Sequence, residues 1–600
     1  MADQRSVRSS QLISPYGPGA IVDIGDESLL LTDLKGWPRN LIDVKLPRLA
    51  RELGVTSLKS PPEKPEFGQD VDYKSVTAIR FPRWMFCPSC RKMEYWKTES
   101  GHMDEGQPVC SILKCRKRAL VPMRFVMACQ SGHMGDVPWD YWAHSGSNGN
   151  RKCPSKKSNL YFTSKPELGS GLEALLVECR YCKSYRDLGN ITSPDAIQSI
   201  GLRCTGSQPW ETWEEGCQES PVVLQRGASN LYFPVVRSAL DIPVVEAKQE
   251  HGEKSAAIRS HNFFSACQNL YESKSEDAAR SLAIIIAGDN NCTVDDVFEV
   301  LKPLEEHKGK IGAPPSAEEL QEAEWKVLVS PDVETSSNPQ FSARVESSLS
   351  ANDYWKIAEK IERVVLLDKL REVRAFCGYE RVKPTNELIP PAGQNEDIKW
   401  LPAIEVFGEG IFIEFSDRAL TAWENKSSHF IQSRIGLLIK RYGENDLSYL
   451  PEPSARLVVL HTMAHLLIRQ LSFECGYSSG SIRERIYAAE GQVGILIYTA
   501  DSDSEGSLGG LVQQGEAARL MATFAAALDQ ASWCSNDPVC SEMETQGVMG
   551  LNKAACHSCT LVSETSCGMN NLLLDRKLLL GDSSGNGLFS DSLAIIKSGV

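Results

Sequence analysis

The sequence predicts an α+β protein of several domains, with a cysteine-rich, zinc-ribbon-like N-terminal half, a helical middle region and a mixed α/β C-terminal domain carrying a cysteine-bound metal. Three observations lead to this fold class. The chain has 600 residues, of which 42% are hydrophobic, enough for three or four domains with filled cores. Most of its 19 cysteines lie in two dense stretches, residues 87–217 and 534–567. Helical apolar patterns are concentrated between about residues 255 and 380.

Residues 1–75 are expected to form an N-terminal arm and linker. SPYGPGAIVDIGD contains a Gly/Pro turn before a short strand, and SPPEKPEFGQDVDY (60–73) is typical of a linker. The N-terminus lacks the apolar segment of a signal peptide, and no uninterrupted apolar run reaches the roughly 18 residues of a membrane span. We therefore expect a cytoplasmic protein that does not contact membranes. In a reducing compartment its cysteines are better explained as metal ligands or buried apolar residues than as disulfides.

Residues 76–243 are predicted to be a zinc-binding, cysteine-rich region of short strands. Its first cysteine group combines a CPSC knuckle with a second pair about twenty residues later, a loop of zinc-ribbon size. The predicted ligands are Cys87, Cys90, Cys110 and Cys115. The alternative is a set of buried free thiols.

Two further groups follow in chain order. The stretch CQSGHMGDVPWDYWAH and the following RKCP predict a Cys₂His₂ site of Cys129, His133, His144 and Cys153. The alternative is that the aromatic residues of this stretch form a small core on which the histidines pack. A second knuckle, CRYC, with two later thiols predicts a site of Cys179, Cys182, Cys204 and Cys217.

Residues 244–395 are predicted to be a helical middle region. Helical spacing of apolar residues occurs in DDVFEVLKPL (295–304), SAEELQEAEWKVL (316–328) and YWKIAEKIERVVLLDKLREV (354–373). Ser316 and Glu319 have the spacing of a capping box.

Residues 396–600 are predicted to be a mixed α/β domain with a terminal cysteine cluster; its association with a helicase is implied only by the resemblance described below. EGIFIEF (409–415) and GILIYTA (494–500) are typical of strands, and EAARLMATFAAALDQ is typical of a helix. Another helix is expected around HTMAH (461–465), with Ser454 as its N-cap.

The two histidines of HTMAH raise the question of a zinc protease, because histidines four apart share one helix face. A catalytic zinc also needs a third ligand and a general base, and Thr462 stands where that base would be. We therefore predict that His461 and His465 are core residues and that the chain is not a protease.

The C-terminal cysteines predict a fourth metal site. Cys556 and Cys559 form its knuckle, with Cys540 and Cys567 as the favoured partners. Five thiols for four positions leave one over, and the remaining candidates are Cys534 and His557. An iron–sulfur cluster is the alternative to zinc. Three to four zinc ions are expected in all. Sites closed by four protein ligands stabilise folds and have no position open for catalysis.

Charge is unevenly distributed along the chain. The net charge is −14, but residues 76–160 contain 14 Lys+Arg and 6 Asp+Glu, a balance of +8 that leaves −22 for the remainder. A basic module can bind a polyanion such as DNA, although a solvated lysine-rich surface explains the same composition. The candidate DNA-binding residues are Lys114, Arg116, Lys117 and Arg118.

The loop DSDSEGSLGG (501–510) suggests a different function. Its acidic residues could bind a divalent metal and make the chain a hydrolase or nuclease. The alternative is an ordinary surface loop. No GxxxxGK[ST] motif occurs, so the sequence contains no P-loop.

Several long stretches resemble one family. They are VRSSQLISPYGPGAIVDI, CQSGHMGDVPWDYWAH, RGASNLYFPVVRSALDIP, LHTMAHLLIRQL with CGYSSGSIRERIY, YTADSDSEGSLGGL and AACHSCTLVSETSCGMNNLLLDR. Together they resemble the DrmB family of the DISARM anti-phage defence systems. The C-terminal third is similar to a domain of unknown function also found in Mrf-type helicases, where it accompanies a cysteine-bound zinc.

The resemblance implies a subunit that is not itself an enzyme. It implies a heterodimer with a superfamily-two helicase of the DrmA type, engagement of DNA by the pair, and structural zinc held by the cysteine clusters. Arg226, Arg483 and Arg485 are the arginines inside family-like motifs, and the sequence assigns them no contact with DNA. A scaffold that binds only protein is the third possible function.

Overall fold

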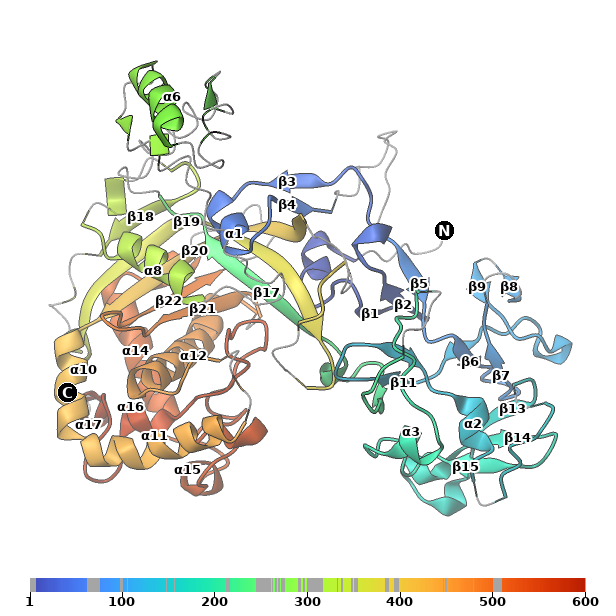
Figure 1. Cartoon of the computed structure of the whole chain (residues 1–600). Coiled ribbons are helices and arrows are strands. Elements are labelled where there is room, and N and C mark those ends of the chain that lie inside the picture. The colour runs from blue at the N-terminus through green and yellow to red at the C-terminus, as the bar shows by residue number, and fades with distance from the viewer. Residues whose placement is uncertain are drawn as a thin grey trace.

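A long, strongly curved β-sheet connects the two halves of the molecule (Figure 1). The computed structural model describes residues 7–598 with gaps; those of four residues or more are 62–75, 212–215, 244–260, 271–275, 299–316, 350–353, 384–387, 393–398 and 500–509. The main path of the sheet runs β17-β19-β20-β22-β21, and β18, β4 and β3 extend it. Its strands are β3 (Ile42–Val44), β4 (Ser57–Ser60), β17 (Phe233–Leu240), β18 (Ser342–Val345), β19 (Ile361–Glu380), β20 (Trp400–Phe415), β21 (Ile482–Tyr487) and β22 (Gly494–Thr499).

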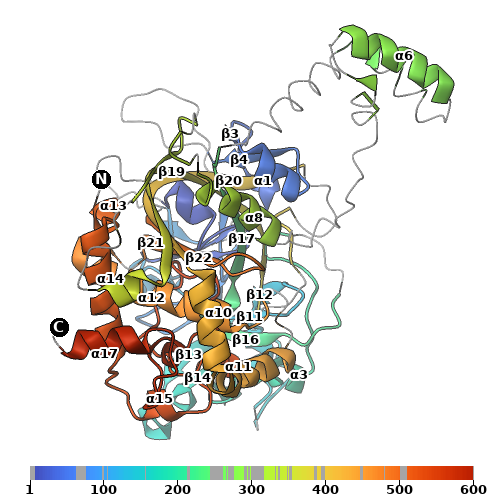
Figure 2. The same ribbon diagram turned by 90° about the vertical axis from the view of Figure 1, so that its left-hand side faces the viewer.

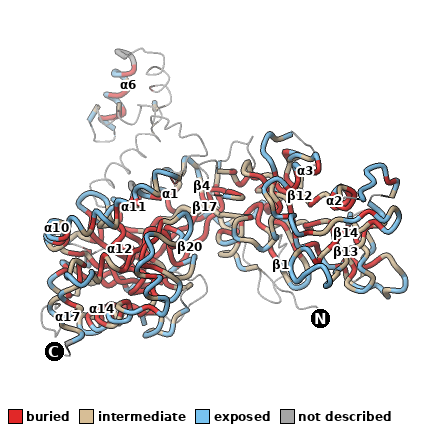
Figure 3. The backbone as a smooth tube through the Cα atoms, turned by 90° about the horizontal axis from the view of Figure 1, so that it is seen from below, coloured by how far each residue is buried: buried red, intermediate tan, exposed pale blue. Residues whose placement is uncertain are grey.

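Helices of the C-terminal third cover one face of this sheet and form the largest hydrophobic core (Figures 1 and 3). The central one, α12, packs against β21, β22, α14 and α16 and is buried along most of its length. Ser454 caps it by accepting a hydrogen bond from the Leu457 amide, as predicted. These helices are α9 (Trp355–Ala358), α10 (Asp417–Lys426), α11 (Ser428–Gly443), α12 (Ala455–Cys475), α13 (Gly510–Gln514), α14 (Ala517–Ala531), α15 (Val539–Glu542), α16 (Arg576–Leu580) and α17 (Ser590–Ser598).

The cysteine-rich half is built from short strands in small sheets, as predicted. Three three-stranded sheets have the orders β10-β6-β7, β12-β11-β16 and β13-β14-β15, and a fourth, β1-β2-β5, lies between them and the main sheet. Its elements are β1 (Ile21–Ile24), β2 (Glu27–Leu31), β5 (Ala78–Arg80), β6 (Trp84–Phe86), β7 (Met93–Tyr95), β8 (Met103–Asp104), β9 (Gln107–Pro108), β10 (Val121–Pro122), β11 (Phe125–Ala128), β12 (Met134–Asp136), α2 (Trp139–Ala143), β13 (Leu160–Ser164), β14 (Leu175–Cys179), β15 (Tyr185–Asp187), α3 (Ala196–Ser199) and β16 (Val222–Gln225). Helix α1 (Pro47–Glu52) packs against β4 of the main sheet.

The middle region is less helical than predicted. Helices α6 (Glu276–Asp289) and α8 (Ala317–Leu328) are present. The helix expected over 354–373 is wrong: after the short α9, residues 361–380 form β19, which pairs with β17, β18 and β20. Much of 295–304, the Ser316 end of the expected capping box and residues 500–509 of the acidic loop lie outside the described residues.

One sheet draws strands from all four regions predicted from the sequence. β3 and β4 come from the first, β17 from the second, β18 and β19 from the third, and β20 to β22 from the fourth. In the side view of Figure 2, the C-terminal helices α10, α11, α12 and α17 lie below the strands of the curved sheet, whereas β3, β4 and α1 lie near its top. The domain boundaries predicted at residues 75, 243 and 395 therefore all fall within the span of one sheet. The division into four domains stays a prediction.

No described helix is both long and apolar enough to cross a membrane.

Candidate metal centres

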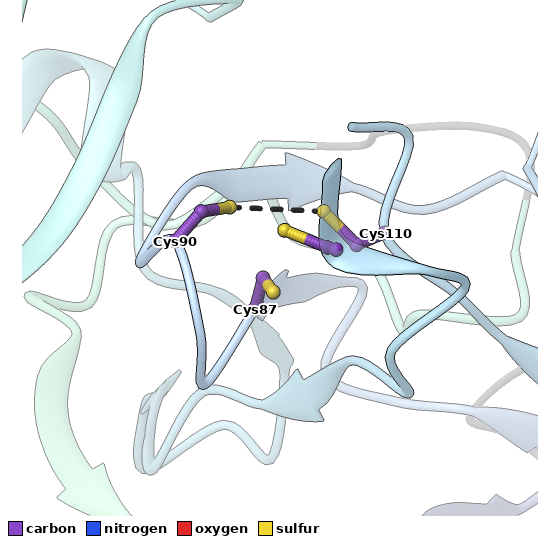
Figure 4. A group of neighbouring side chains, drawn as sticks. Cys87, Cys90 and Cys110 are labelled. Atoms are coloured by element: carbon purple, nitrogen blue, oxygen red, sulfur yellow. Dashed lines mark hydrogen bonds between the residues drawn. The ribbon is translucent and has the colours of Figure 1, made fainter. Parts of the chain in front are cut away.

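Among the described residues, cysteine and histidine side chains, in one case with a glutamate, come together in five groups, which we name clusters 1 to 5 in the order of their description. In each, the potential ligand atoms lie within 4.8 Å of one another. Cluster 1 is Cys87, Cys90, Cys110 and Cys115, the grouping expected from the sequence. Figure 4 shows the labelled thiols of this cluster converging, with Cys90 Sγ 3.7 Å from Cys110 Sγ. Four thiols at this spacing suit tetrahedral zinc.

The two CxxC knuckles of the cysteine-rich half share one backbone geometry. In the first, the Cys87 amide donates to the Lys92 carbonyl and the Arg91 amide donates back to the Cys87 carbonyl. In the second, Cys179 and Lys183 repeat the pattern, with Ser184 as the acceptor of the first bond. Arg91 and Lys183 both have left-handed φ angles, 65° and 63°. The turn therefore aims both thiols of each knuckle at one point.

The grouping expected for the next eight ligands was wrong. Cluster 2 joins Cys129 and His133 to the later pair Cys204 and Cys217, whereas cluster 3 joins His144 and Cys153 to the knuckle of Cys179 and Cys182. The two predicted sites have therefore exchanged one ligand pair. The reason is packing: Cys129 follows β11, whose partner β16 begins shortly after Cys204 and Cys217 in the chain, while α2 carries His144 against β14 and β15.

Hydrogen bonds orient the histidine of cluster 3. His144 is buried, and its Nδ1 lies 2.6 Å from the carbonyl oxygen of Asp140. That bond assigns the proton to Nδ1 and leaves Nε2 as the free lone pair, as metal-binding histidines require. His144 Nε2 has no hydrogen-bond partner among the described residues. A buried nitrogen without a partner fits a metal ligand.

Cluster 4 lies near the C-terminus and corrects another prediction. Its four thiols are Cys534, Cys540, Cys556 and Cys559, so Cys534 takes the place predicted for Cys567. Cys534 Sγ is 3.5 Å from Cys556 Sγ, and Cys540 Sγ is 3.8 Å from Cys559 Sγ. His557 is exposed and does not join the group.

In each of clusters 2, 3 and 4, one thiol has a lowered pKa and a neighbouring thiol has a raised one. Contacts with Cys129 and His133 hold the pKa of Cys204 at about 4. Burial raises the pKa of Cys556, but hydrogen bonds from Asn536 and neighbouring groups outweigh it and bring the pKa to about 6. In the same way, Ser184 brings the pKa of Cys182 to about 6 against the effect of burial. Thiolate is the form that binds metal, so clusters 2, 3 and 4 each contain a thiol ready for it.

His461 and His465 are buried core residues, as predicted, but they are not isolated. With Glu484 and Cys567 they form cluster 5, in which all four side chains are buried. Thr462 is held structurally: its hydroxyl donates to the Val458 carbonyl and accepts a bond from the Asp575 amide. Sequence reasoning missed this group because no knuckle spacing links its members: Glu484 lies on the strand that follows the helix, and Cys567 is 106 residues from His461.

The candidate DNA-binding residues lie on the surface beside cluster 1. Lys114, Arg116, Lys117 and Arg118 are all exposed, and they surround Cys115. Arg116 and Lys117 have left-handed φ angles of 49° and 54°. Lys117 pairs with Asp104 at 3.0 Å, a surface contact of little energy.

The arginines of the family-like motifs have mainly structural surroundings. Arg485 is buried and bridges Glu324 and Glu372, linking β21 to α8 and β19. Arg226 lies 3.5 Å from Asp23. Burial and the nearby charge of Arg374 lower the pKa of Arg483, and the carboxylate of Glu372 partly opposes them.

Comparison with known proteins agrees with this arrangement. Residues 8–233, which contain clusters 1, 2 and 3, match a family described as a domain of unknown function, DUF8724. Residues 463–560, which contain all four cysteines of cluster 4, match the MrfA Zn-binding domain. The chain is 31% identical over 595 residues to the DISARM protein DrmB of Bacillus paralicheniformis, an alignment that covers 93% of this chain and 97% of that protein. The chain thus has a zinc-binding domain and further tetrads suited to zinc.

Proposed function

The chain belongs to the DrmB family of DISARM proteins, and from this membership we propose that it is a non-catalytic, zinc-stabilised subunit of a cytoplasmic anti-phage complex. In this proposal it forms a heterodimer with a superfamily-two helicase of the DrmA type and helps that helicase hold DNA. The observation that carries the proposal is the likeness over 93% of the chain, which spans both cysteine-rich ends and the sheet between them.

The proposed zinc ligands are the sixteen residues of clusters 1 to 4. Each cluster supplies four ligands, so the ions would be structural, with no position left for a reacting water. Elemental analysis of the purified chain should find about four zinc from these clusters. Replacing one cysteine, as in Cys90→Ser, should remove one of them. Fewer than two zinc per chain would contradict this part of the proposal.

The proposed DNA contact is the exposed loop of Lys114, Arg116, Lys117 and Arg118. Cluster 1 holds the backbone of this loop in place, so less conformational entropy would be lost when it binds phosphates. The module of residues 76–160 carries +8 while the remainder carries −22. A duplex would therefore approach this module and be repelled by most other surfaces.

Salt dependence of DNA binding tests this contact. The helicase complex, purified after co-expression, should bind DNA with a log–log salt slope that becomes shallower by roughly 3 to 4 when all four cations are changed to glutamate, because four phosphate contacts release their counterions. A matched control reverses four exposed cations on the helical body, namely Arg418, Lys426, Lys440 and Arg519, and should change affinity and slope much less. Zinc content should be the same in all three proteins.

Two results would contradict the DNA contact. In one, the loop variant keeps its affinity and slope but no longer co-purifies with the helicase, which would make the loop a protein interface. In the other, both four-charge variants weaken binding equally, which would mean that net charge and not a local contact is responsible.

The absence of catalysis by this chain is also a proposal. The sequence has no P-loop, and the position of a protease base is occupied by Thr462, whose hydroxyl is already hydrogen-bonded to the Val458 carbonyl and the Asp575 amide. The chain purified without helicase should hydrolyse neither ATP nor peptides. Turnover that is lost in His461→Asn, or metal-dependent nuclease activity lost in Asp501→Ala, would contradict it.

A further inference from the structure

Cluster 5 combines residues from three separate elements in the core of the C-terminal body. His461 and His465 lie one turn apart on α12, Glu484 lies on β21, and Cys567 lies in the segment before α16. The side chains of both histidines are fully buried, and the side chain of Glu484 is 1% exposed. No match to a known zinc-binding domain covers this set, because His461 and Cys567 fall outside residues 463–560.

The ligand atoms are at metal-binding distances. His461 Nε2 lies 3.2 Å from Cys567 Sγ and 3.0 Å from Glu484 Oε1, and His465 Nε2 lies 3.4 Å from the same carboxylate oxygen. Bonds of about 2.0 to 2.3 Å to tetrahedral zinc imply separations of roughly 3.3 to 3.8 Å between ligands. The set therefore needs little movement to surround one ion.

Both imidazoles have the orientation of metal ligands. His461 Nδ1 lies 3.4 Å from the Leu573 carbonyl oxygen, and His465 Nδ1 lies 3.1 Å from that of Thr560. Protons on Nδ1 leave both Nε2 lone pairs facing the centre of the cluster. The Cys567 sulfur accepts bonds from the backbone amides of Met569 and Asn571, at 3.3 and 3.2 Å. Amide donors stabilise a thiolate.

A purely proton-based explanation leaves polar atoms unsatisfied. If an imidazolium paired with Glu484, the facing atoms would form hydrogen bonds. Yet the two approaches to Glu484 Oε1, at 3.0 and 3.4 Å, lack the angles of good hydrogen bonds, and Glu484 Oε2 has no partner among the described residues. Buried polar atoms without partners are costly. One divalent cation would satisfy these atoms together and would neutralise the two negative charges of the carboxylate and the thiolate.

We propose that cluster 5 is a further structural zinc site, with His461, His465, Glu484 and Cys567 as its four ligands. The ion joins α12, β21 at the end of the sheet path, and the C-terminal segment, where the Glu484 amide also donates to the Ser566 carbonyl. With four protein ligands the site is closed to substrate. It stabilises the body of the protein and does not create the protease that HTMAH suggests.

Thr560 links this site to cluster 4. Its carbonyl oxygen accepts a hydrogen bond from His465 Nδ1, and its hydroxyl donates to Cys559 Sγ at 3.2 Å. Thr560 therefore couples the position of Cys559 in cluster 4 to the orientation of the His465 ring in cluster 5.

Metal content of variants of the full chain tests the proposal. Wild-type protein expressed with zinc should contain one zinc more than clusters 1 to 4 supply. Each of His465→Asn, Glu484→Gln and Cys567→Ser should lose one equivalent, whereas the matched controls His429→Asn and Cys475→Ser, which alter residues of the same types outside the clusters, should lose none. Equal zinc in the wild type and all three variants would overturn the proposal, as would iron or copper in place of that one zinc.

If the variants fail to fold, a measurement on the wild-type protein tests the same proposal. After exchange of zinc for cadmium-113, clusters 1 to 4 present three or four sulfur ligands per ion, whereas cluster 5 presents one. A nuclear magnetic resonance signal from a site with one sulfur ligand supports the proposal, and signals confined to sulfur-rich sites overturn it. Because clusters 1 to 4 give their own signals, failure of cluster 5 is distinguishable from failure of the zinc sites in the proposed function.

Discussion

At the scale of single residues, Arg381 ties three distant segments together. Its fully buried guanidinium donates to the carbonyl oxygens of Gly19, Gly132 and Leu231 at 2.7 to 3.0 Å. It also lies 4.7 Å from the ring centre of Tyr379. Gly132 is in the turn between two ligands of cluster 2, so this arginine connects the end of β19 to a metal cluster.

Arg381→Ala should lower the free energy of unfolding by about 3 kcal/mol or more, because three buried acceptors lose a charged donor. The midpoint of chemical unfolding of the zinc-loaded protein measures the change. Arg344→Ala provides the control: its side chain is 43% exposed and pairs with Asp368 at 3.4 Å, so its loss should cost less than about 1 kcal/mol. Equal shifts in the two variants would contradict a special role for Arg381.

Residue-level prediction from sequence succeeded where the chemistry is local. A CxxC knuckle predicts that its own two thiols lie close together. This is so for Cys87 and Cys90 in cluster 1 and for Cys179 and Cys182 in cluster 3. Which later pair joins a given knuckle depends on sheet packing, which spacing does not reveal; hence the exchange between clusters 2 and 3. The partners of Arg381 lie 150 to 362 residues away in the sequence, and no spacing motif links Glu484 to His461 and His465.

At the scale of elements, β19 shows why a strand can resemble a helix in sequence. Every residue from Leu370 to Glu380 is buried, so the strand lacks the alternation that identifies one face. Its charged residues include Arg371 and Glu372, which suggest a helix surface but are buried in ion pairs. By contrast, α12 was predictable because Ser454 marks its start and its apolar run is long.

Val373→Pro tests the position of β19 within the sheet. Val373 pairs with Ala239 of β17 and Glu405 of β20, so proline there disrupts ladders on both sides and should cost more than about 3 kcal/mol. Asp368→Pro is the control, because Asp368 lies at a register shift and pairs in neither the β18 nor the β20 register. The yield of folded protein and its thermal midpoint measure both. Similar losses would contradict the central position of Val373.

At the scale of the whole molecule, the two halves depend on different forces. The C-terminal body has a continuous hydrophobic core from α12, α14 and the sheet, whereas the cysteine-rich half has short strands around smaller cores. A structural zinc site can supply roughly 10 kcal/mol of apparent folding energy, comparable to the whole stability of a domain. Three of the clusters lie in the half with less apolar burial.

Chelation should therefore unfold the molecule in two stages. Strong chelator should expose the amides of residues 84–225 to hydrogen exchange first, while α12 and β22 stay protected by their core. Cys179→Ser should produce the same pattern without chelator, because loss of one thiolate removes the binding energy of cluster 3, and Cys475→Ser, outside every cluster, should not. The sheet sets the limit of the first stage: β17 follows the cysteine-rich region directly but pairs with β19 along its length. Protection of β17 should consequently persist with that of the body, and its loss together with residues 84–225 would show that the two halves unfold as one unit.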